Sequence, residues 1–178
     1  KGGREVLDAF AHVRRSHPAA TLVIVGDQPK GAVGEGVEVI GFLKKENPEQ
    51  SARLRDIFAR SRAVVNLSRS DTAPVLLIEA AYFGCPVVSS RRFAIPEIVD
   101  DARTGFLIDG LHDVDALAGA IKRLLEDDDN YGQMRAAAWA SSRRRFSRGQ
   151  FDQNMATFLK RAIHEVSSRA QPSGVNAF

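Results

Sequence analysis

Two acidic residues in the middle of the chain, Asp71 and Glu79, have the types and surroundings for polar chemistry at a binding site. They stand eight positions apart within residues 68–91, SRSDTAPVLLIEAAYFGCPVVSSR. Glu79 lies among apolar residues, where a lone charge is costly to bury, so its carboxylate needs water, a cation or a ligand. From spacing alone, an acid in the first turn of a helix and a Glu that reaches water or an Arg remain the simpler alternative.

The same stretch predicts the elements that position these two acids. The segment 68–73 is short and mostly polar, as expected for a loop at the end of a strand. Pro74 suits the first turn of a helix, where its missing N–H would be unpaired. Gly84 stops that helix and Pro86 cannot continue it. An apolar strand then begins at Val87, so the stretch is a loop, a helix, a turn and a strand.

Apolar strands alternate with amphipathic helices along the rest of the chain, a pattern typical of parallel βαβ units. We therefore predict an α/β fold, Rossmann-like, with three αβα layers and a mostly parallel sheet over residues 1–168, followed by a loose tail at 169–178. Parallel open sheets bind ligands beyond the carboxyl ends of their strands, which is where residues 68–79 fall. The expected strands are 21–25, 37–40, 63–67, 86–89 and 105–108, and the expected helices are 1–16, 48–60, 95–99, 113–126, 131–145 and 148–168.

Composition bounds the function only loosely. The 178 residues fit one domain, with a net charge of +3 and a pI near 9.3 that hints weakly at anionic partners. No basic stripe with interleaved aromatic residues supports nucleic-acid binding. The single cysteine, Cys85, excludes an intrachain disulfide, fits a reducing compartment and is expected to pack in the core. The four histidines show no metal-ligand spacing. We expect neither a signal peptide nor a bilayer-spanning helix among these 178 residues.

The order of residues from Ser68 to Val88 resembles the signature of retaining glycosyltransferases of the GT-B fold, in particular glycosyltransferase family 4. That family carries Ser-x-x-Glu, a Gly-aromatic-Gly stretch, a second Glu eight residues after the first, and Ala-x-x-x-Gly-x-Pro-Val-Val. The chain departs from it in two places: Asp71 replaces the first Glu, and residues 72–74, Thr-Ala-Pro, replace the Gly-aromatic-Gly stretch. The matching residues are Ser68, Glu79, Ala80, Gly84, Pro86, Val87 and Val88.

The resemblance implies the C-terminal, donor-binding half of a GT-B enzyme, which moves a sugar from a nucleotide-diphosphate sugar to an acceptor hydroxyl with retention. Glu79 would bind the ribose hydroxyls, because a carboxylate accepts two hydrogen bonds from a vicinal diol. The N–H groups of Val75 and Leu76 would face the phosphates at the positive end of the helix. This interpretation fails if Glu79 points away from the strand ends or is buried against a basic partner.

Further site residues follow from the same resemblance. Asp71 would contact the transferred sugar and Lys1 the diphosphate, so these two are the candidate catalytic residues. Phe42 or Leu43 would touch the nucleotide base, although an apolar residue at a strand end is more often simple core. Ser68 completes the set of donor-binding residues.

The family scheme requires neither a metal nor another cofactor. The implied partners are the nucleotide sugar, with UDP or GDP as the nucleotide, and an N-terminal acceptor-binding domain. The arginine-rich segment 143–148 is expected to be a solvated end of a helix, with a weak contact with a membrane surface as the alternative. The expected location is the cytoplasm, including the inner face of a membrane.

In the family, an Arg and a strand precede the Lys-Gly pair, and that strand is the central one of the sheet. A fold without it would expose two strand edges. We therefore expect the chain to be a piece of a longer protein, or another segment to complete the sheet.

Two other hypotheses remain open. A non-catalytic nucleotide-binding or interaction module on the same fold is favoured by Asp71 and Pro74, where the family has Glu and Gly. An unrelated flavodoxin-like or Rossmann-like domain would make the match from Ser68 to Val88 a coincidence.

Overall fold

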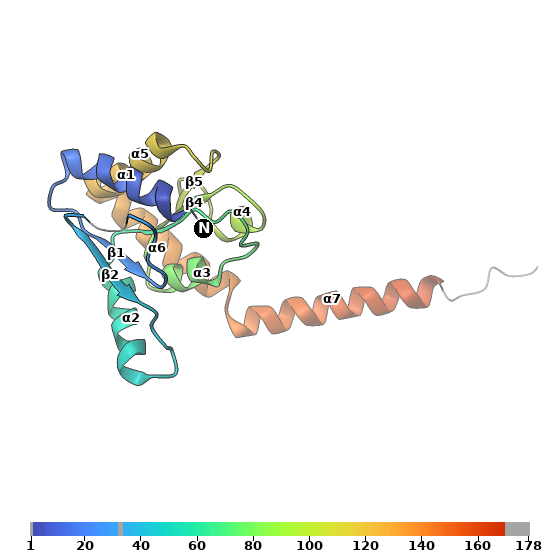
Figure 1. Cartoon of the computed structure of the whole chain (residues 1–178). Coiled ribbons are helices and arrows are strands. Elements are labelled where there is room, and N and C mark those ends of the chain that lie inside the picture. The colour runs from blue at the N-terminus through green and yellow to red at the C-terminus, as the bar shows by residue number, and fades with distance from the viewer. Residues whose placement is uncertain (1, 32–33, 170–178) are drawn as a thin grey trace, which may run out of the picture.

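A computed structural model of the chain describes residues 2–31 and 34–169. Helices and strands alternate along most of it, as Figure 1 shows. In chain order the elements are α1 (Gly3–Ser16), β1 (Leu22–Val25), β2 (Val37–Gly41), α2 (Pro48–Arg60), β3 (Val64–Asn66), α3 (Val75–Tyr82), β4 (Val87–Ser90), α4 (Ile95–Ile98), β5 (Gly105–Ile108), α5 (Val114–Glu126), α6 (Asp128–Arg145) and α7 (Arg148–Arg169).

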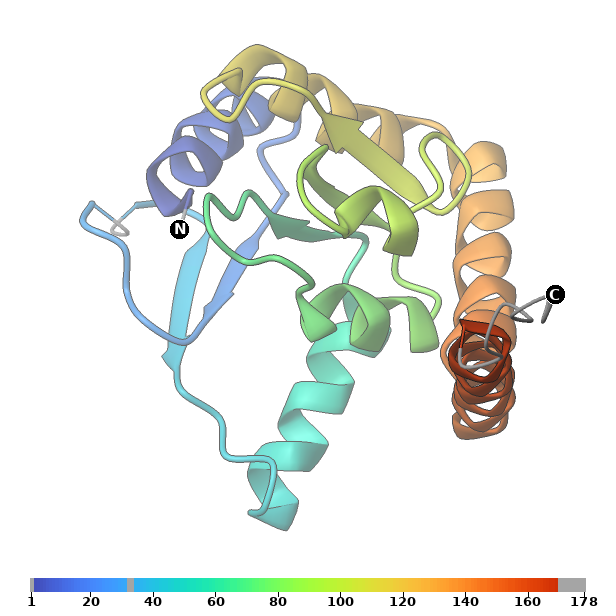
Figure 2. The ribbon, with the colours of Figure 1, turned by 90° about the vertical axis from the view of Figure 1, so that its right-hand side faces the viewer.

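The strands form two parallel sheets, one with the order β1-β2 and the other with the order β3-β4-β5. Figure 2 shows the sheets next to each other, with β1 on the side nearer to β3. Within the described residues, β1 pairs only with β2 and β3 only with β4, so each has one open edge. The expected pair of open strand edges is therefore present.

The three-stranded sheet is covered on both faces, which confirms the predicted αβα layers. Two adjacent residues of β4 belong to the buried clusters on opposite faces of the sheet. Val88 packs with α1, α5 and the start of α6, whereas Val87 packs with α2, α3 and α4. Every residue of β4 and β5 is buried. The strands β1 and β2 are only partly covered, and none of their residues belongs to either buried cluster.

Local sequence explains most element boundaries. The side chain of Asn47 accepts hydrogen bonds from the N–H groups of Glu49 and Gln50, so α2 begins at Pro48 as predicted. Asp113 caps α5 in the same way, through the N–H of Ala116 at 2.8 Å.

The prediction that residues 127–130 separate two helices was wrong. Helix α6 begins at Asp128, because the side chain of Asp127 accepts a hydrogen bond from the N–H of Asn130 at 2.9 Å. Acidic residues in a first turn also favour a helix start through the helix dipole. Asp127 thus ends α5 and caps α6 at once.

The last helix, α7, begins after Ser147 as predicted and extends away from the other elements (Figure 1). Several of its apolar residues are exposed rather than packed. Their exposure ranges from 42% to 65% for Phe151, Met155, Phe158, Leu159 and Ile163. The predicted loose tail begins at Arg169, and its residues 170–178 lie outside the described residues.

Candidate functional site

The loops that leave the carboxyl ends of the strands form the candidate site. Because the strands are parallel within each sheet, the loops that follow them gather along one edge of that sheet. A backbone hydrogen bond from Ala94 N–H to Thr72 O, 3.0 Å long, joins the loops after β3 and β4. The loops begin at Gly26, Phe42, Leu67, Arg91 and Asp109.

Helix α3 starts within this set of loops without a side-chain cap. Pro74 precedes it in an extended conformation, as the N-cap residue rather than as part of the first turn. Helix geometry leaves the N–H groups of Val75 and Leu76 without an intrahelical acceptor. Both side chains are exposed, by 61% and 37%. The start of α3 is therefore open to a ligand, as the predicted phosphate contact requires.

Helix α3 is held in place by packing and ends at a glycine. Leu77 and Ala80, on its inner face, are fully buried. Gly84, with a φ of 64°, takes the left-handed conformation that ends a helix. Cys85 follows in the core, where burial raises the pKa of its thiol to about 12. Its burial confirms that Cys85 packs in the core.

Glu79 lies on α3 with a side chain that is 31% exposed, and its carboxylate forms an ion pair with Nζ of Lys45. The lysine is itself 55% exposed. The carboxylate is thus neither turned fully to solvent nor buried against a basic partner. Lys45 belongs to the loop after β2, so the pair places Glu79 beside the loop that carries Phe42 and Leu43.

The predicted base-contacting residues differ in exposure. Phe42 is 75% exposed, while Leu43 is half-buried. Gly41 ends β2 with a φ of 78°, a conformation that favours glycine and turns the chain into the loop. An aromatic side chain so exposed does not belong to the core, which removes the alternative of simple packing for Phe42.

The loop after β3 is shaped by Ser68. Its side chain is buried, and its hydroxyl oxygen accepts a hydrogen bond from the N–H of Asp71 at 3.0 Å. Ser90 donates its hydroxyl to the carbonyl oxygen of Ser68 at 3.3 Å. These bonds set the position of Asp71, which is half-buried. The predicted contacts of Ser68 and Asp71 with a donor remain predictions.

Sequence reasoning missed a cluster of charged side chains beside this loop. Glu5, buried in the first turn of α1, meets the guanidinium of Arg69 and, at 2.7 Å, Nδ1 of His112. Hydrogen bonds from its own backbone N–H, Arg69 and His112 lower the pKa of the Glu5 carboxyl, against the opposing effect of burial. The cluster ties α1 to the loops after β3 and β5. Lys1, which precedes α1, lies outside the described residues.

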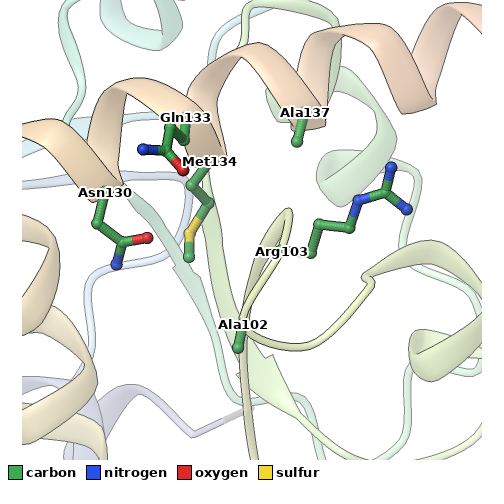
Figure 3. Close-up of a pocket in the computed structure, with 6 residues that line it drawn as sticks. All are labelled: Ala102, Arg103, Asn130, Gln133, Met134 and Ala137. Carbon is green, nitrogen blue, oxygen red and sulfur yellow. The ribbon is translucent and has the colours of Figure 1, made fainter.

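A polar pocket lies away from these loops, between α6 and the turn that precedes β5 (Figure 3). That turn leads into the amino end of β5, so the pocket is not at the carboxyl ends of the strands. None of its lining residues was predicted as a site residue. They are Ala102, Arg103, Asn130, Gln133, Met134 and Ala137.

Neither a metal cluster nor a bilayer span is found in the part of the chain that the structure describes. No group of three or more His, Cys, Asp or Glu residues there could hold a metal ion. Within the same residues no helix is both long and apolar enough to cross a bilayer. The metal-free scheme stays an expectation.

The family model described as glycosyl transferases group 1 matches residues 1–127. Among curated proteins, a D-inositol 3-phosphate glycosyltransferase of Corynebacterium kroppenstedtii is 30% identical over 169 residues, covering 83% of this chain and 37% of that protein. A GDP-mannose-dependent alpha-(1-6)-phosphatidylinositol monomannoside mannosyltransferase of Mycolicibacterium smegmatis is 30% identical over 154 residues, covering 79% and 40%. The chain therefore spans about two fifths of the length of these relatives.

Solved structures share the fold. The C-terminal domain of a glycosyl transferase group 1 family protein, LpcC of Francisella tularensis, superposes with a TM-score of 0.69 at 19% identity, covering 83% of this chain and 80% of that one. Anabaena HepE in complex with UDP-glucose superposes with a TM-score of 0.71 at 23% identity, covering 90% and 45%.

Proposed function

Since the chain belongs to the glycosyl transferases group 1 family, we propose that it is the donor-binding part of a glycosyltransferase. It would hold a nucleotide-diphosphate sugar while the sugar moves to an acceptor hydroxyl, with retention at the anomeric carbon, as in glycosyltransferase family 4. The names of its curated relatives, an inositol phosphate glycosyltransferase and a mannosyltransferase, support sugar transfer.

One observation carries this proposal: the partly exposed carboxylate of Glu79 stands on the helix whose free N–H groups open at the same edge of the sheet. In our proposal the carboxylate accepts hydrogen bonds from the ribose hydroxyls, and the N–H groups of Val75 and Leu76 bind the phosphates. Phe42, exposed on the loop that carries Lys45, offers a face for the base. A nucleoside diphosphate matches these groups in order: base, ribose, phosphate.

Asp71 and Lys1 complete the proposed donor site. Asp71 would hold hydroxyls of the transferred sugar, and Lys1 would contribute positive charge to the diphosphate as it departs, where negative charge develops. We propose no metal and no further cofactor in this scheme. The donor nucleotide is proposed to be UDP or GDP.

The acceptor and the remaining catalytic groups are proposed to lie on an N-terminal domain. The match to about two fifths of the length of the curated relatives supports such a partner. The chain alone should then bind nucleotide weakly and show no turnover, so robust sugar transfer by it would contradict the proposal. A cytoplasmic location, with a weak contact between residues 143–148 and the inner face of a membrane, completes the assignment.

The second candidate is a non-catalytic nucleotide-binding or interaction module on the same fold. Two residues favour it: Asp71 is one methylene shorter than the family's Glu, and Pro74 supplies no N–H at the start of α3. On this alternative, a longer protein that contains the chain would not transfer sugar, whether or not the chain binds nucleotide.

Calorimetric titration of the chain with UDP, GDP and ADP tests the proposal. We expect UDP or GDP to bind, and Glu79→Gln to weaken that binding by about tenfold or more, as for the loss of a charge-assisted hydrogen bond. Glu49→Gln is the matched control, because this exposed Glu lies in the first turn of α2 and not on α3. Absence of binding by all three nucleotides, or equal binding by Glu79→Gln and the unmutated chain, would contradict the proposal.

A further inference from the structure

Lys45 and Glu79 are 34 positions apart in sequence, yet their side chains form an ion pair across the candidate site. The lysine comes from the loop after β2, in the two-stranded sheet, and the glutamate from α3, which packs on the three-stranded sheet. The pair therefore connects the two sheets at the edge where the ligand loops lie.

The backbone that carries Lys45 is held on both sides. The N–H of Lys44 donates to Oε1 of Gln50 at 2.7 Å, and the N–H of Asn47 donates to the carbonyl oxygen of Lys44 at 3.2 Å. Asn47 also caps α2. Lys45 thus extends toward Glu79 from a turn that is anchored to a helix.

Stability alone does not account for this arrangement. Exposed ion pairs contribute about 0–1 kcal/mol, because water screens the charges and two long side chains lose freedom. Both side chains here are partly exposed, at 55% and 31%. The pair is therefore more informative about the orientation of the carboxylate than about the folding energy.

We propose that Lys45 is a positioning residue of the nucleotide site, which orients the Glu79 carboxylate toward the two hydroxyl groups of a ribose. This inference rests on the proposed function. Each carboxylate oxygen has two acceptor positions, so a lysine bound to Oε1 leaves both oxygens able to accept one hydroxyl each. The held carboxylate then matches a vicinal diol and makes the site selective for ribonucleotides over 2′-deoxyribonucleotides.

The test compares the binding of UDP and GDP with that of their 2′-deoxy analogues, by calorimetry on the chain. We expect Lys45→Met to weaken ribonucleotide binding by about tenfold, as when a charge-assisted hydrogen bond is lost. Binding of the 2′-deoxy analogues should weaken by only about threefold, since one hydroxyl instead of two then depends on the carboxylate. Lys45→Arg, which keeps a cation in place, should restore part of the selectivity.

Lys44→Met is the matched control, because it removes the same charge from the same loop, and the side chain of Lys44 has no ion pair among the described residues. It should leave both classes of ligand unaffected. In the double variant of Lys45→Met and Glu79→Gln, the loss should be no greater than for Glu79→Gln alone, since the lysine acts through the glutamate.

The outcomes separate this inference from the proposed function. If the unmutated chain binds neither UDP nor GDP, both fail. If it binds them and Lys45→Met binds as tightly, or weakens ribo- and deoxyribonucleotides equally, the positioning role is overturned while the proposed function stands. A thermal midpoint of Lys45→Met close to that of the unmutated chain shows that the variant folds.

Discussion

Gly2 donates its backbone N–H to the carbonyl oxygen of Leu67 at 2.9 Å, which brings the start of α1 against the end of β3. A Cβ at Gly2 would stand 2.5 Å from that oxygen and 2.7 Å from the Cβ of Leu67. The contact is between backbones, so a side chain at this position has no space without a shift of the main chain.

We therefore expect Gly2→Ala to lower the free energy of unfolding by about 1–3 kcal/mol, the usual cost of overpacking. Urea denaturation measures the change. The control is Gly119→Ala, because a Cβ there meets nothing within 4 Å and the residue lies inside α5. This control should gain about 1 kcal/mol from helix propensity. Equal stability of Gly2→Ala and the unmutated chain would contradict the close approach.

The shared cap between α5 and α6 leads to a second expectation. Asp127→Ala removes the acceptor for the N–H of Asn130 and should cost about 0.5–2 kcal/mol of stability. Asp129→Ala, in the same acidic run, is the comparison, since its side chain caps no N–H group among the described residues. If both variants lose the same amount, the run acts by charge rather than through one cap.

Glu5 should make stability depend on pH. Its folded pKa lies below the ordinary value, so the ionised carboxylate stabilises the fold above that ordinary value of 4.5, and the stabilisation is lost as the pH falls through the lowered pKa. We expect Glu5→Gln to be less stable by about 1–3 kcal/mol at pH 7, as for a broken hydrogen bond to charged partners. The difference from the unmutated chain should shrink below pH 4.5.

Urea denaturation of both proteins from pH 7 down to pH 3 measures this dependence. Glu49→Gln, an exposed glutamate in α2, corrects for general effects of charge. A difference that stays constant across the range would mean that the contacts with Arg69 and His112 do not require the ionised carboxylate.

Cys85 offers a probe of unfolding. Its thiol is buried, with a pKa of about 12, so a disulfide reagent at pH 8 should react about a thousandfold more slowly than with an ordinary thiol. The absorbance of the thiolate released from the reagent measures the reaction rate, and addition of denaturant should restore the reactivity of an ordinary thiol. Rapid labelling of the folded chain would show that the core around the end of α3 opens readily.

Elements with local signals could be predicted from the sequence. Helix α2 has Asn47 and Pro48 at its start, and β5 is a short apolar run that begins at a glycine, so their bounds were predicted correctly. The start of α6 departs from the prediction because a run of acids such as 127–129 is typical of a linker, whereas here one Asp ends a helix and caps the next.

The site was predicted less completely because its contacts are not local. Glu79 could be found from the residues around it, but nothing near Lys45 in sequence indicates that it meets a residue 34 positions away. Glu5 was missed for a similar reason, since its partners follow 64 and 107 positions later. The signal that could have found Glu5 is its place on α1. This charged residue stands one helical turn before Ala9, on the side of the helix that is buried.

The division of the strands into two sheets has a dynamic consequence. Amide hydrogens of β1 and β2, whose cover is incomplete, should exchange with solvent faster than those of β4, which opens only when the larger core does. A ligand that touches both Phe42 and α3 would connect the more mobile two-stranded sheet to the more rigid three-stranded sheet. Part of its binding energy would then go into slowing the motions of the two-stranded sheet. Protection of the β2 amide hydrogens against exchange would therefore report ligand binding more sensitively than a change in structure would.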